Sequence, residues 1–473
     1  MKQGELTIDL LKTARTPLFV QLCDQIRDHI TSGRLSAKTR LPASRQLALD
    51  AGVSRSTVVT AYEQLVAEGY IEGRRGSGYY PIALGDVSLP EPGNRAMPEP
   101  PGETADSNAS SMTHPGYPDS RLFPYRAWAR SLARCARIAP KAMITSDSPF
   151  GDTRLRRSIA QYLSDWRGLD ITPEQVMVTA GSVDALETCI RTLTSPGDVV
   201  GLENPGYRPL RNLVSTQGMA IEWLGVGNEG AELPDPDRRG APTRMVVITP
   251  SHQFPLGGAM PINRRREYQH WAECNDAWII EDDYDSEFRY AGRPIPALAS
   301  LDDSARTIYV GTFSKVFSVS LRLAYLIMPR ALIGDFRDTL SRYGVKAALP
   351  CQPALADFID SGELYRHIRR TRRSYAERRR LLLELLRSEL SEFGRFEDHQ
   401  AGMQIAFRLN PDFDDQAISA AAKQAGAQVT PLSAYYGGGG AEQGLLLGFC
   451  PFEAPEIRHN VEQLAQLLRA QSA

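Results

Sequence analysis

Short apolar runs alternate with helical segments along most of this chain, and that alternation restricts its fold more than any other feature. The strand-like runs are 176–178, 199–202, 246–248, 278–280 and 308–310, and each ends in a polar or glycine-containing turn. Strands separated by helices usually pair in parallel, with helices covering both faces of the sheet. The sequence therefore predicts an α/β domain with a mainly parallel sheet over residues 119–473.

The run 308–310 leads into the turn Gly311-Thr312-Phe313-Ser314-Lys315, and Arg322 follows it. A lysine in a pocket that favours its neutral form can make a Schiff base with an aldehyde cofactor. The hydroxyls of Thr312 and Ser314 and the guanidinium of Arg322 suit the phosphate of such a cofactor. A solvated lysine in a strand-end turn would look the same, so other segments must decide.

Other strand ends carry further candidates. Gly181-Ser182-Val183 opens a helix after 176–178, where backbone N–H groups form an anion site. Tyr207 follows 199–202, and its ring either packs internally or stacks on a planar heterocycle.

Acidic residues crowd the end of the run 278–280. The segment 281–285 holds Asp282 and Tyr284 among further carboxylates, which are costly to bury unless a cation or proton is shared there. A metal ion is the less favoured explanation because no histidine lies close in sequence. A carboxylate facing a pyridine nitrogen explains at least one of these acids, because it keeps that nitrogen protonated.

The first eighty residues have a different character, with short amphipathic helices and more basic than acidic side chains. A helix is predicted from Pro17 to Gly33, then a short helix capped by Ser44, then a longer helix over 55–68 capped by Ser54. Val58, Tyr62, Leu65 and Val66 are predicted to face inward, and a glycine turn at Gly52 joins the last two helices. This order is the outline of a helix-turn-helix.

Two short strands around a basic, glycine-rich hairpin follow over 70–80, which indicates a wing. The start of the third helix is predicted to enter the major groove of DNA, and the arginines around it to contact phosphates or the minor groove. The predicted DNA-binding residues are Arg45, Ser54, Arg55, Ser56, Thr57, Arg74, Arg75 and Gly76. An ordinary three-helix domain with solvated arginines is the less favoured alternative.

Residues 82–118 are rich in Pro, Gly, Ser and acids and have neither helical nor strand period, which predicts a flexible linker between domains 1–81 and 119–473. The net charge of the whole chain is -2, so a basic DNA-binding face would have to be local. The six cysteines are scattered without a metal or disulfide spacing, no apolar run spans a membrane, and a cytoplasmic location is expected.

The amino-terminal motifs at 41–48, 52–58, 68–70 and 76–78 resemble the winged helix-turn-helix of the GntR superfamily of bacterial regulators. The segments 122–124, 151–156, 249–255, 281–288 and 311–315 resemble fold-type I aminotransferases that depend on pyridoxal 5'-phosphate (PLP). The whole chain resembles the MocR subfamily, in which both parts are joined. The resemblance implies a small α+β winged head and an α/β aminotransferase-like domain with a smaller α+β subdomain.

The resemblance also implies roles for residues. Lys315 would form the Schiff base with PLP, Asp282 would pair with the pyridine nitrogen, and Tyr284 would contact the ring hydroxyl. Tyr207 would stack on the ring. Gly181, Ser182, Val183, Thr312 and Arg322 would surround the phosphate, where the hydroxyl of Ser314 is also expected from its place in the turn.

Two positions depart from the enzymes that the domain resembles. Phe254 stands where they have an asparagine that holds the ring hydroxyl, a role that His252 or Gln253 would then have to take. Leu446 stands where enzymes acting on α-amino acids place an arginine for the substrate carboxylate. The sequence therefore predicts good PLP binding and weaker binding of ordinary α-amino acids.

We expect a homodimeric regulator that senses a small amine or amino-acid-like effector at Lys315 and performs at most a half-transamination. A working aminotransferase with an accessory DNA-binding head stays open, as does PLP itself as the signal. The arginine-rich helix predicted over 364–390 is expected to be solvated or dimer-facing rather than to touch DNA.

Overall fold

The computed structural model divides into two compact units, Met1–Glu103 and Thr104–Ala473, and each is described here by itself. The structure describes residues 6, 8–11, 16–74, 76–83, 110–111, 115–145, 148–292, 295–302, 304–425 and 427–472. The predicted DNA-binding residue Arg75 and most of the predicted linker 82–118 lie outside these residues.

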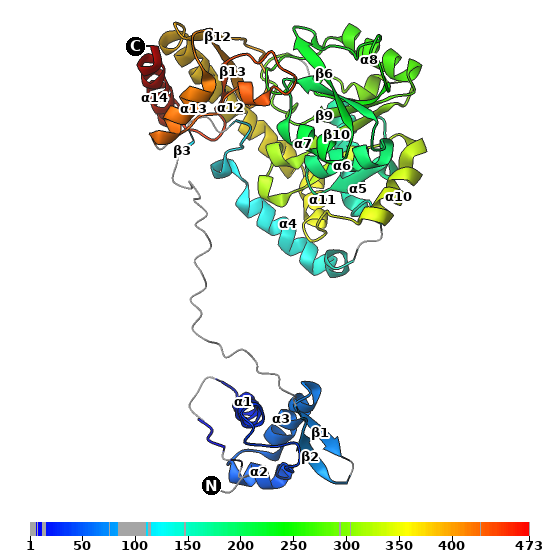
Figure 1. Cartoon of the computed structure of the whole chain (residues 1–473), viewed down its shortest axis with the longest axis vertical. Helices are drawn as coiled ribbons and strands as arrows, with labels where there is room; N and C mark the ends of the chain where they lie inside the picture. Colours follow the sequence, from blue (N-terminus) through cyan, green and yellow to red (C-terminus); the bar gives the residue numbers. More distant parts are fainter. Residues whose placement is uncertain are drawn as a thin grey trace. The chain divides into compact units, whose positions relative to one another are not determined.

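The first unit is a winged helix-turn-helix, as the sequence predicts (Figure 1). Its elements are α1 (Leu18–Thr31), α2 (Ser44–Asp50), α3 (Arg55–Ala67), β1 (Ile71–Arg74) and β2 (Gly78–Pro81), and the two strands form an antiparallel hairpin. Apolar side chains spaced by three or four meet between the helices: Leu22, Ile26, Leu47, Val58, Tyr62 and Leu65. The helical period of the sequence therefore fixes the core of this unit.

Two local predictions for this unit were wrong. The N-cap of α2 is Ala43, and Ser44 is already the first helical residue without a side-chain capping bond. Val66 is 40% exposed, and Ala61 is buried in the core instead. Ser54 does cap α3, because its hydroxyl accepts a hydrogen bond from the N–H of Thr57 at 3.1 Å.

The second unit is built on an eight-stranded sheet in the order β4-β11-β10-β9-β8-β5-β6-β7. The strands are β4 (Val176–Thr179), β5 (Val199–Asn204), β6 (Ala220–Gly227), β7 (Gly230–Ala231), β8 (Thr243–Ile248), β9 (Trp278–Asp283), β10 (Thr307–Thr312) and β11 (Ala324–Ile327). The strands β10, β9, β8, β5 and β6 pair in parallel, whereas β11 and β7 are antiparallel to their neighbours. The prediction of a mainly parallel sheet is confirmed.

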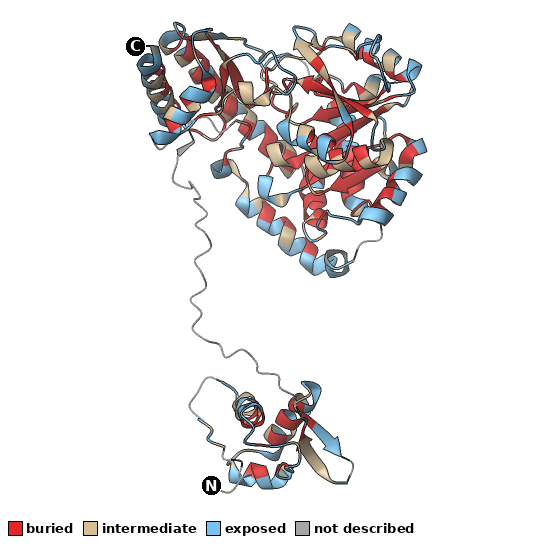
Figure 2. Ribbon diagram, in the orientation of Figure 1, coloured by how far each residue is buried: buried red, intermediate tan, exposed pale blue. Residues whose placement is uncertain are grey.

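Helices cover both faces of this sheet, and its strands are buried almost throughout (Figure 2). One face packs against α6 (Ser182–Leu193), α7 (Arg208–Thr216) and α10 (Ile333–Tyr343). The other face is covered by α5 (Thr153–Arg167), α8 (Ile262–Cys274) and α11 (Gln352–Asp360), and α4 (Tyr125–Ile138) packs on α11. The carboxyl ends of the parallel strands remain uncovered by these layers, which is where ligands bind in open α/β sheets.

A smaller α+β part completes the second unit. It holds an antiparallel sheet of β12 (Gly394–Phe396), β13 (Gln404–Leu409) and β15 (Gly444–Gly448), together with α13 (Asp415–Gln424) and α14 (Ala454–Ser472). The long helix α12 (Glu363–Glu389) packs against both α11 and α14. The end of the predicted linker also belongs here, because β3 (Ser110–Ser111) pairs with β14 (Ala427–Gln428).

Most arginines of α12 are engaged within this unit. Arg372 donates to the carbonyl of Glu287, Arg378 bonds Asp119, and Arg379 pairs with Asp398. These side chains therefore hold the helix to its surroundings, which favours a structural role for it over contact with DNA.

Candidate functional site

A cavity of about 490 Å³ lies at the carboxyl ends of the parallel strands, where the sequence predicts the cofactor. All the residues predicted to bind the cofactor line it: Gly181, Ser182, Val183, Tyr207, Asp282, Tyr284, Thr312, Ser314, Lys315 and Arg322. They come from the ends of β4, β5, β9 and β10 and from the segment after β10. Residues more than a hundred positions apart in sequence are thus brought to one site.

Lys315 lies on the single helical turn α9 (Phe313–Val316), directly after β10. Its Nζ donates a hydrogen bond to the carbonyl oxygen of Gly116 at 2.8 Å. Burial lowers the pKa of Lys315 below its ordinary value, although the nearby Asp285 and Asp282 act in the opposite direction. A larger share of neutral amine is what a lysine needs to attack an aldehyde.

Asp282 is the residue before the last of β9 and lines the cavity, and its Oδ1 is buried without a hydrogen-bond partner among the described residues. Burial, together with the neighbouring Asp283 and Glu203, raises the pKa of Asp282 to about 7. A buried carboxylate oxygen without a donor is costly. A ring N–H that reached this oxygen would supply the missing donor, so this residue fits a pyridinium nitrogen.

Tyr284 is held from behind by His252. The tyrosine hydroxyl lies 2.8 Å from Nδ1 of His252, and the same Nδ1 lies 3.1 Å from both carboxylate oxygens of Asp285. Burial raises the pKa of Tyr284 well above its ordinary value, so its hydroxyl keeps its proton at neutral pH. A protonated hydroxyl facing the cavity can donate to an oxygen of a bound ring.

Another group of residues that line the cavity could bind an anion. Gly181 caps α6 with φ +100°, and a Cβ placed there would lie 3.7 Å from the guanidinium of Arg322. Thr312 accepts the N–H of Ser314 at 3.1 Å, which fixes the turn that presents both hydroxyls. Arg322 forms no ion pair or hydrogen bond through its side chain within the described residues, so its charge is available to a ligand phosphate.

The structure shows where the two positions that differ from aminotransferases lie, Phe254 and Leu446. Phe254 lines the cavity and meets Tyr284 edge to face, with ring centroids 5.6 Å apart. Gln253 turns away, since its amide donates to Glu203 and to the carbonyl of Pro205. His252 is not among the residues that line the cavity, and it contacts the hydroxyl of Tyr284, which is. Leu446 is fully buried in β15 among apolar side chains.

Sequence reasoning missed several residues of the cavity wall. Gly116 and Gln404 lie beside Lys315, and Arg208 stands at the start of α7. Gln404 occupies an apolar strand pattern, where a lone polar residue is a signal that could have drawn attention. Gly116 fell inside the predicted linker, whose composition gives no such signal.

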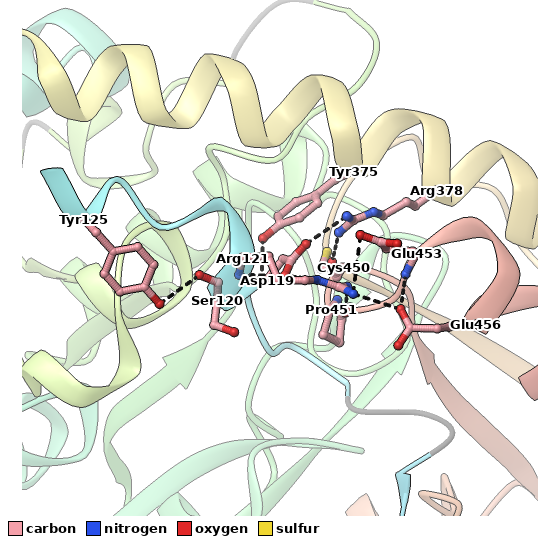
Figure 3. A network of polar contacts seen from close by, with 10 residues as sticks. All are labelled: Asp119, Ser120, Arg121, Tyr125, Tyr375, Arg378, Cys450, Pro451, Glu453 and Glu456. Atoms are coloured by element: carbon pink, nitrogen blue, oxygen red, sulfur yellow. Dashed lines mark hydrogen bonds and ion pairs between the residues drawn. The ribbon is translucent and has the colours of Figure 1, made fainter. Parts of the chain in front are cut away.

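The chain after Gly116 is fixed by a network of polar contacts (Figure 3). The carboxylate of Asp119 accepts from Arg121 at 2.9 Å and from Arg378 of α12 at 2.8 Å. Arg121 also pairs with Glu456 of α14, and the hydroxyl of Tyr375 accepts the N–H of Asp119 at 2.9 Å. This network fixes the segment after Gly116 to α12 and α14.

The described residues that are predicted to bind DNA lie on α2, at the start of α3 and on the hairpin. Arg45, Ser54, Arg55 and Ser56 are exposed, and Thr57 is half-buried. Arg74 is exposed on β1, pairs with Glu72 at 2.7 Å and lies over the ring of Tyr80. Gly76 turns the hairpin with φ +75°. Arg40, which the sequence analysis did not select, approaches Gly78 beside the turn of this hairpin.

The described residues contain neither a membrane-spanning helix nor a cluster of metal-binding side chains. None of the helices there combines the length and apolar character needed to cross a membrane. No group of three or more His, Cys, Asp and Glu side chains among those residues is placed to hold a metal ion.

Comparisons with known proteins agree with this two-part organisation. Residues 18–80 match the family model "Bacterial regulatory proteins, gntR family", and residues 117–440 match "Aminotransferase class I and II". The solved structure of kynurenine aminotransferase from Pyrococcus horikoshii superposes with a TM-score of 0.71 at 24% identity, covering 77% of this chain and 92% of that one. The aminotransferase LysN from Thermus thermophilus gives a TM-score of 0.69 at 24% identity, covering 77% and 93%.

Similar curated proteins are regulators that extend over the whole chain. The probable rhizopine catabolism regulatory protein MocR of Rhizobium meliloti is 38% identical, covering 96% of this chain and 94% of that protein. The pyridoxine biosynthesis regulator PdxR of Corynebacterium glutamicum is 34% identical, covering 96% and 97%. The chain belongs to the MocR subfamily of GntR-type bacterial transcription regulators, with a winged helix-turn-helix and an aminotransferase class I and II domain.

Proposed function

We propose that this protein regulates transcription by binding DNA through its winged head and by sensing a small amine at PLP bound to Lys315. The observation that carries the proposal is the cavity, in which a lysine of lowered pKa and the unpartnered Oδ1 of Asp282 face the same space. PLP supplies an aldehyde for the lysine and a ring that acts as an electron sink.

The cavity residues have separate tasks in this proposal. Lys315 binds the cofactor covalently, and Asp282 holds a proton at the pyridine nitrogen. Tyr284, kept in place by His252, donates to the ring hydroxyl. Tyr207 packs against the ring, since it lies at the end of β5 and meets Phe254 edge to face.

The phosphate is assigned to the opposite end of the cavity. Arg322, the start of α6 at Gly181, Ser182 and Val183, and the hydroxyls of Thr312 and Ser314 supply its donors. Because the chain supplies groups for both the ring and the phosphate of PLP, we expect the cofactor to be oriented before any effector binds.

Effector binding is proposed without full turnover. Leu446 provides no charge for an α-carboxylate and is buried away from the cavity wall. A working aminotransferase would transfer amino groups repeatedly between a donor and a keto acid. We therefore expect at most one half-reaction for each bound cofactor.

The head is proposed to read duplex DNA through Ser54, Arg55, Ser56 and Thr57, with Arg45, Arg74, Arg75 and Gly76 against the backbone or minor groove. Domains 1–81 and 119–473 are proposed as the functional units, joined by 82–118. A homodimer in the cytoplasm would present two heads to two half-sites.

The test uses the full chain reconstituted with PLP. Duplex sequences are first selected from a random pool by the protein, and binding of the selected duplex is then measured with and without PLP and with PLP plus single amines. We expect an absorbance band of protein-bound PLP that is lost in Lys315→Ala, and DNA affinity that changes with an amine. Multiple turnovers with an amino donor and a keto acid would refute the regulator proposal, and a response to PLP alone would make PLP the signal.

A further inference from the structure

Gln404 is the first residue of β13 and lines the cavity beside Lys315. Gln404 is 4% exposed, and within the part of the chain that the structure describes neither Oε1 nor Nε2 has a hydrogen-bond partner. A buried carboxamide without partners is costly, and an apolar residue at this place in the strand would avoid that cost. The unsatisfied group therefore points to a ligand that supplies the partners.

The geometry places this carboxamide next to the reactive nitrogen. A Cβ built on Gly116 would lie 3.0 Å from Nζ of Lys315 and 3.5 Å from Oε1 of Gln404. The lysine nitrogen, the Gly116 backbone and the carboxamide thus meet at one point. An effector amine that reacted at Lys315 would bring the substituents of its carbon close to this point.

The surroundings of this point favour a neutral hydrogen-bonding group over a carboxylate. The charged side chains that act on Lys315 are Asp285 and Asp282, and both are acidic. Across the strand, Gln404 pairs with Gly448 of β15, and the neighbouring Leu447 and Leu446 add no charge. A carboxylate here would meet the negative potential of Asp285 and Asp282, whereas the arginines of the cavity wall, Arg208 and Arg322, are not among the charges that act on Lys315.

The available donors and acceptors point the same way. The carbonyl of Gly116 only accepts, and the carboxamide of Gln404 both donates and accepts. A hydroxyl can donate to one of these groups while it accepts from the other. A carboxylate can only accept, so it can pair with the amide of Gln404 but not with the Gly116 carbonyl.

We propose that Gln404 sets effector specificity, and that the site takes a primary amine whose adjacent carbon carries a neutral hydroxyl-bearing group, an amino alcohol, in preference to an α-amino acid. This inference rests on the proposed function, since it assumes PLP at Lys315. It goes further because it names the chemical class of the effector and the residue that selects it.

The experiment titrates the PLP-loaded full-length protein with L-alaninol, sec-butylamine and L-alanine, and follows the cofactor absorbance and the unfolding temperature. sec-Butylamine has the shape of alaninol with a methyl in place of the hydroxyl. The wild-type protein should prefer alaninol over sec-butylamine by roughly three- to tenfold, as one net hydrogen bond to a buried group allows. L-Alanine should bind more weakly than alaninol.

Gln404→Met keeps the length of the side chain and removes its polar atoms. The variant should fold at least as stably as the wild type and should lose most of the preference for alaninol. The two amines differ in basicity, but that difference is the same for both proteins, so the change in the ratio reports the side chain. Asn212→Leu, which removes an exposed amide at the same cavity, is the control and should keep the wild-type ratio.

The outcomes separate this inference from the proposed function. If no absorbance band forms, or if the band persists in Lys315→Ala, the cofactor assignment fails. If the band forms and amines perturb it, but Gln404→Met keeps the wild-type ratio, only the specificity assignment is wrong. Tighter binding of L-alanine than of L-alaninol would also overturn it.

Discussion

Replacing Asp282 with asparagine should stabilise the cofactor-free protein at alkaline pH and weaken the stabilisation that PLP gives. The carboxylate is buried with Oδ1 unpartnered, and burial together with Asp283 and Glu203 raises its pKa from 3.8 to about 7. Between about pH 4 and pH 7 the folded protein therefore keeps a proton that the unfolded chain has already lost. Stability falls as the pH rises from about 4 to about 7, and the full cost is present above that range.

The size of the effect follows from the change in pKa. At about 1.36 kcal/mol for each tenfold change, the ionised carboxylate costs the folded protein about 4 kcal/mol at pH 8.5 and about half of that at pH 5.5. These values are upper limits for the gain in Asp282→Asn, because the asparagine amide is itself left without partners. For a unit of this size, 1 kcal/mol moves the unfolding temperature by about 1–2 °C.

The assay is thermal unfolding of the cofactor-free wild type and Asp282→Asn at pH 5.5 and 8.5, repeated with saturating PLP. The variant should unfold at higher temperature, with the larger gain at pH 8.5, and PLP should raise its unfolding temperature less than that of the wild type. Asp283→Asn is the matched control, because Asp283 pairs with Arg167 at 2.9 Å and its loss should destabilise at both pH values. A gain of equal size at both pH values, or a variant less stable than the wild type at pH 8.5, would refute the reasoning.

Other residues give further predictions. Because burial lowers the pKa of Lys315, PLP capture by the cofactor-free protein should rise with pH and level off at lower pH than for a free lysine amine; a profile like that of free lysine would contradict this. Ser54→Ala should cost the head about 1 kcal/mol in thermal unfolding, because α3 loses its cap. Arg55→Ala should weaken DNA binding and reduce its salt dependence, whereas Leu49→Ala, at a 78% exposed position, should leave both unchanged. Burial would raise the pKa of Asp119, but the bonds from its arginine partners outweigh burial and lower that pKa. The stability that Asp119 contributes should therefore be lost as the pH falls below the ordinary pKa of an aspartate. Asp119→Asn should lose less unfolding temperature on acidification than the wild type does.

The prediction of a mainly parallel sheet is confirmed, and the residues assigned to the cofactor lie at one cavity because most of them follow a strand. Asp282 and Lys315 stand at the ends of apolar runs, and parallel strands bring their carboxyl ends to one edge. The helical period likewise predicted the core of the head, including Tyr62. Period and strand order are local signals, so a single chain is enough to read them.

The rest depended on contacts between segments far apart in sequence. Gly116 lies in a stretch whose composition indicated a linker, and only its bond to Lys315 shows that it is part of the cavity wall. Gln404 became notable only when the structure showed its carboxamide without partners. The exposed Val66 was predicted to be buried because a helical period defines a face but not how far the neighbouring helices reach over it.

The bond between Lys315 and Gly116 gives one nitrogen two competing uses. A lysine bound covalently to PLP would have fewer hydrogens to donate, so its bond to the carbonyl of Gly116 would compete with cofactor binding. Asp119, a little further along the chain, keeps bonds to Arg121 and Arg378 that do not involve this lysine. The backbone here is therefore held at two neighbouring positions, Gly116 and Asp119. Binding of PLP at Lys315 would weaken the bond at Gly116 and leave the bonds of Asp119 intact.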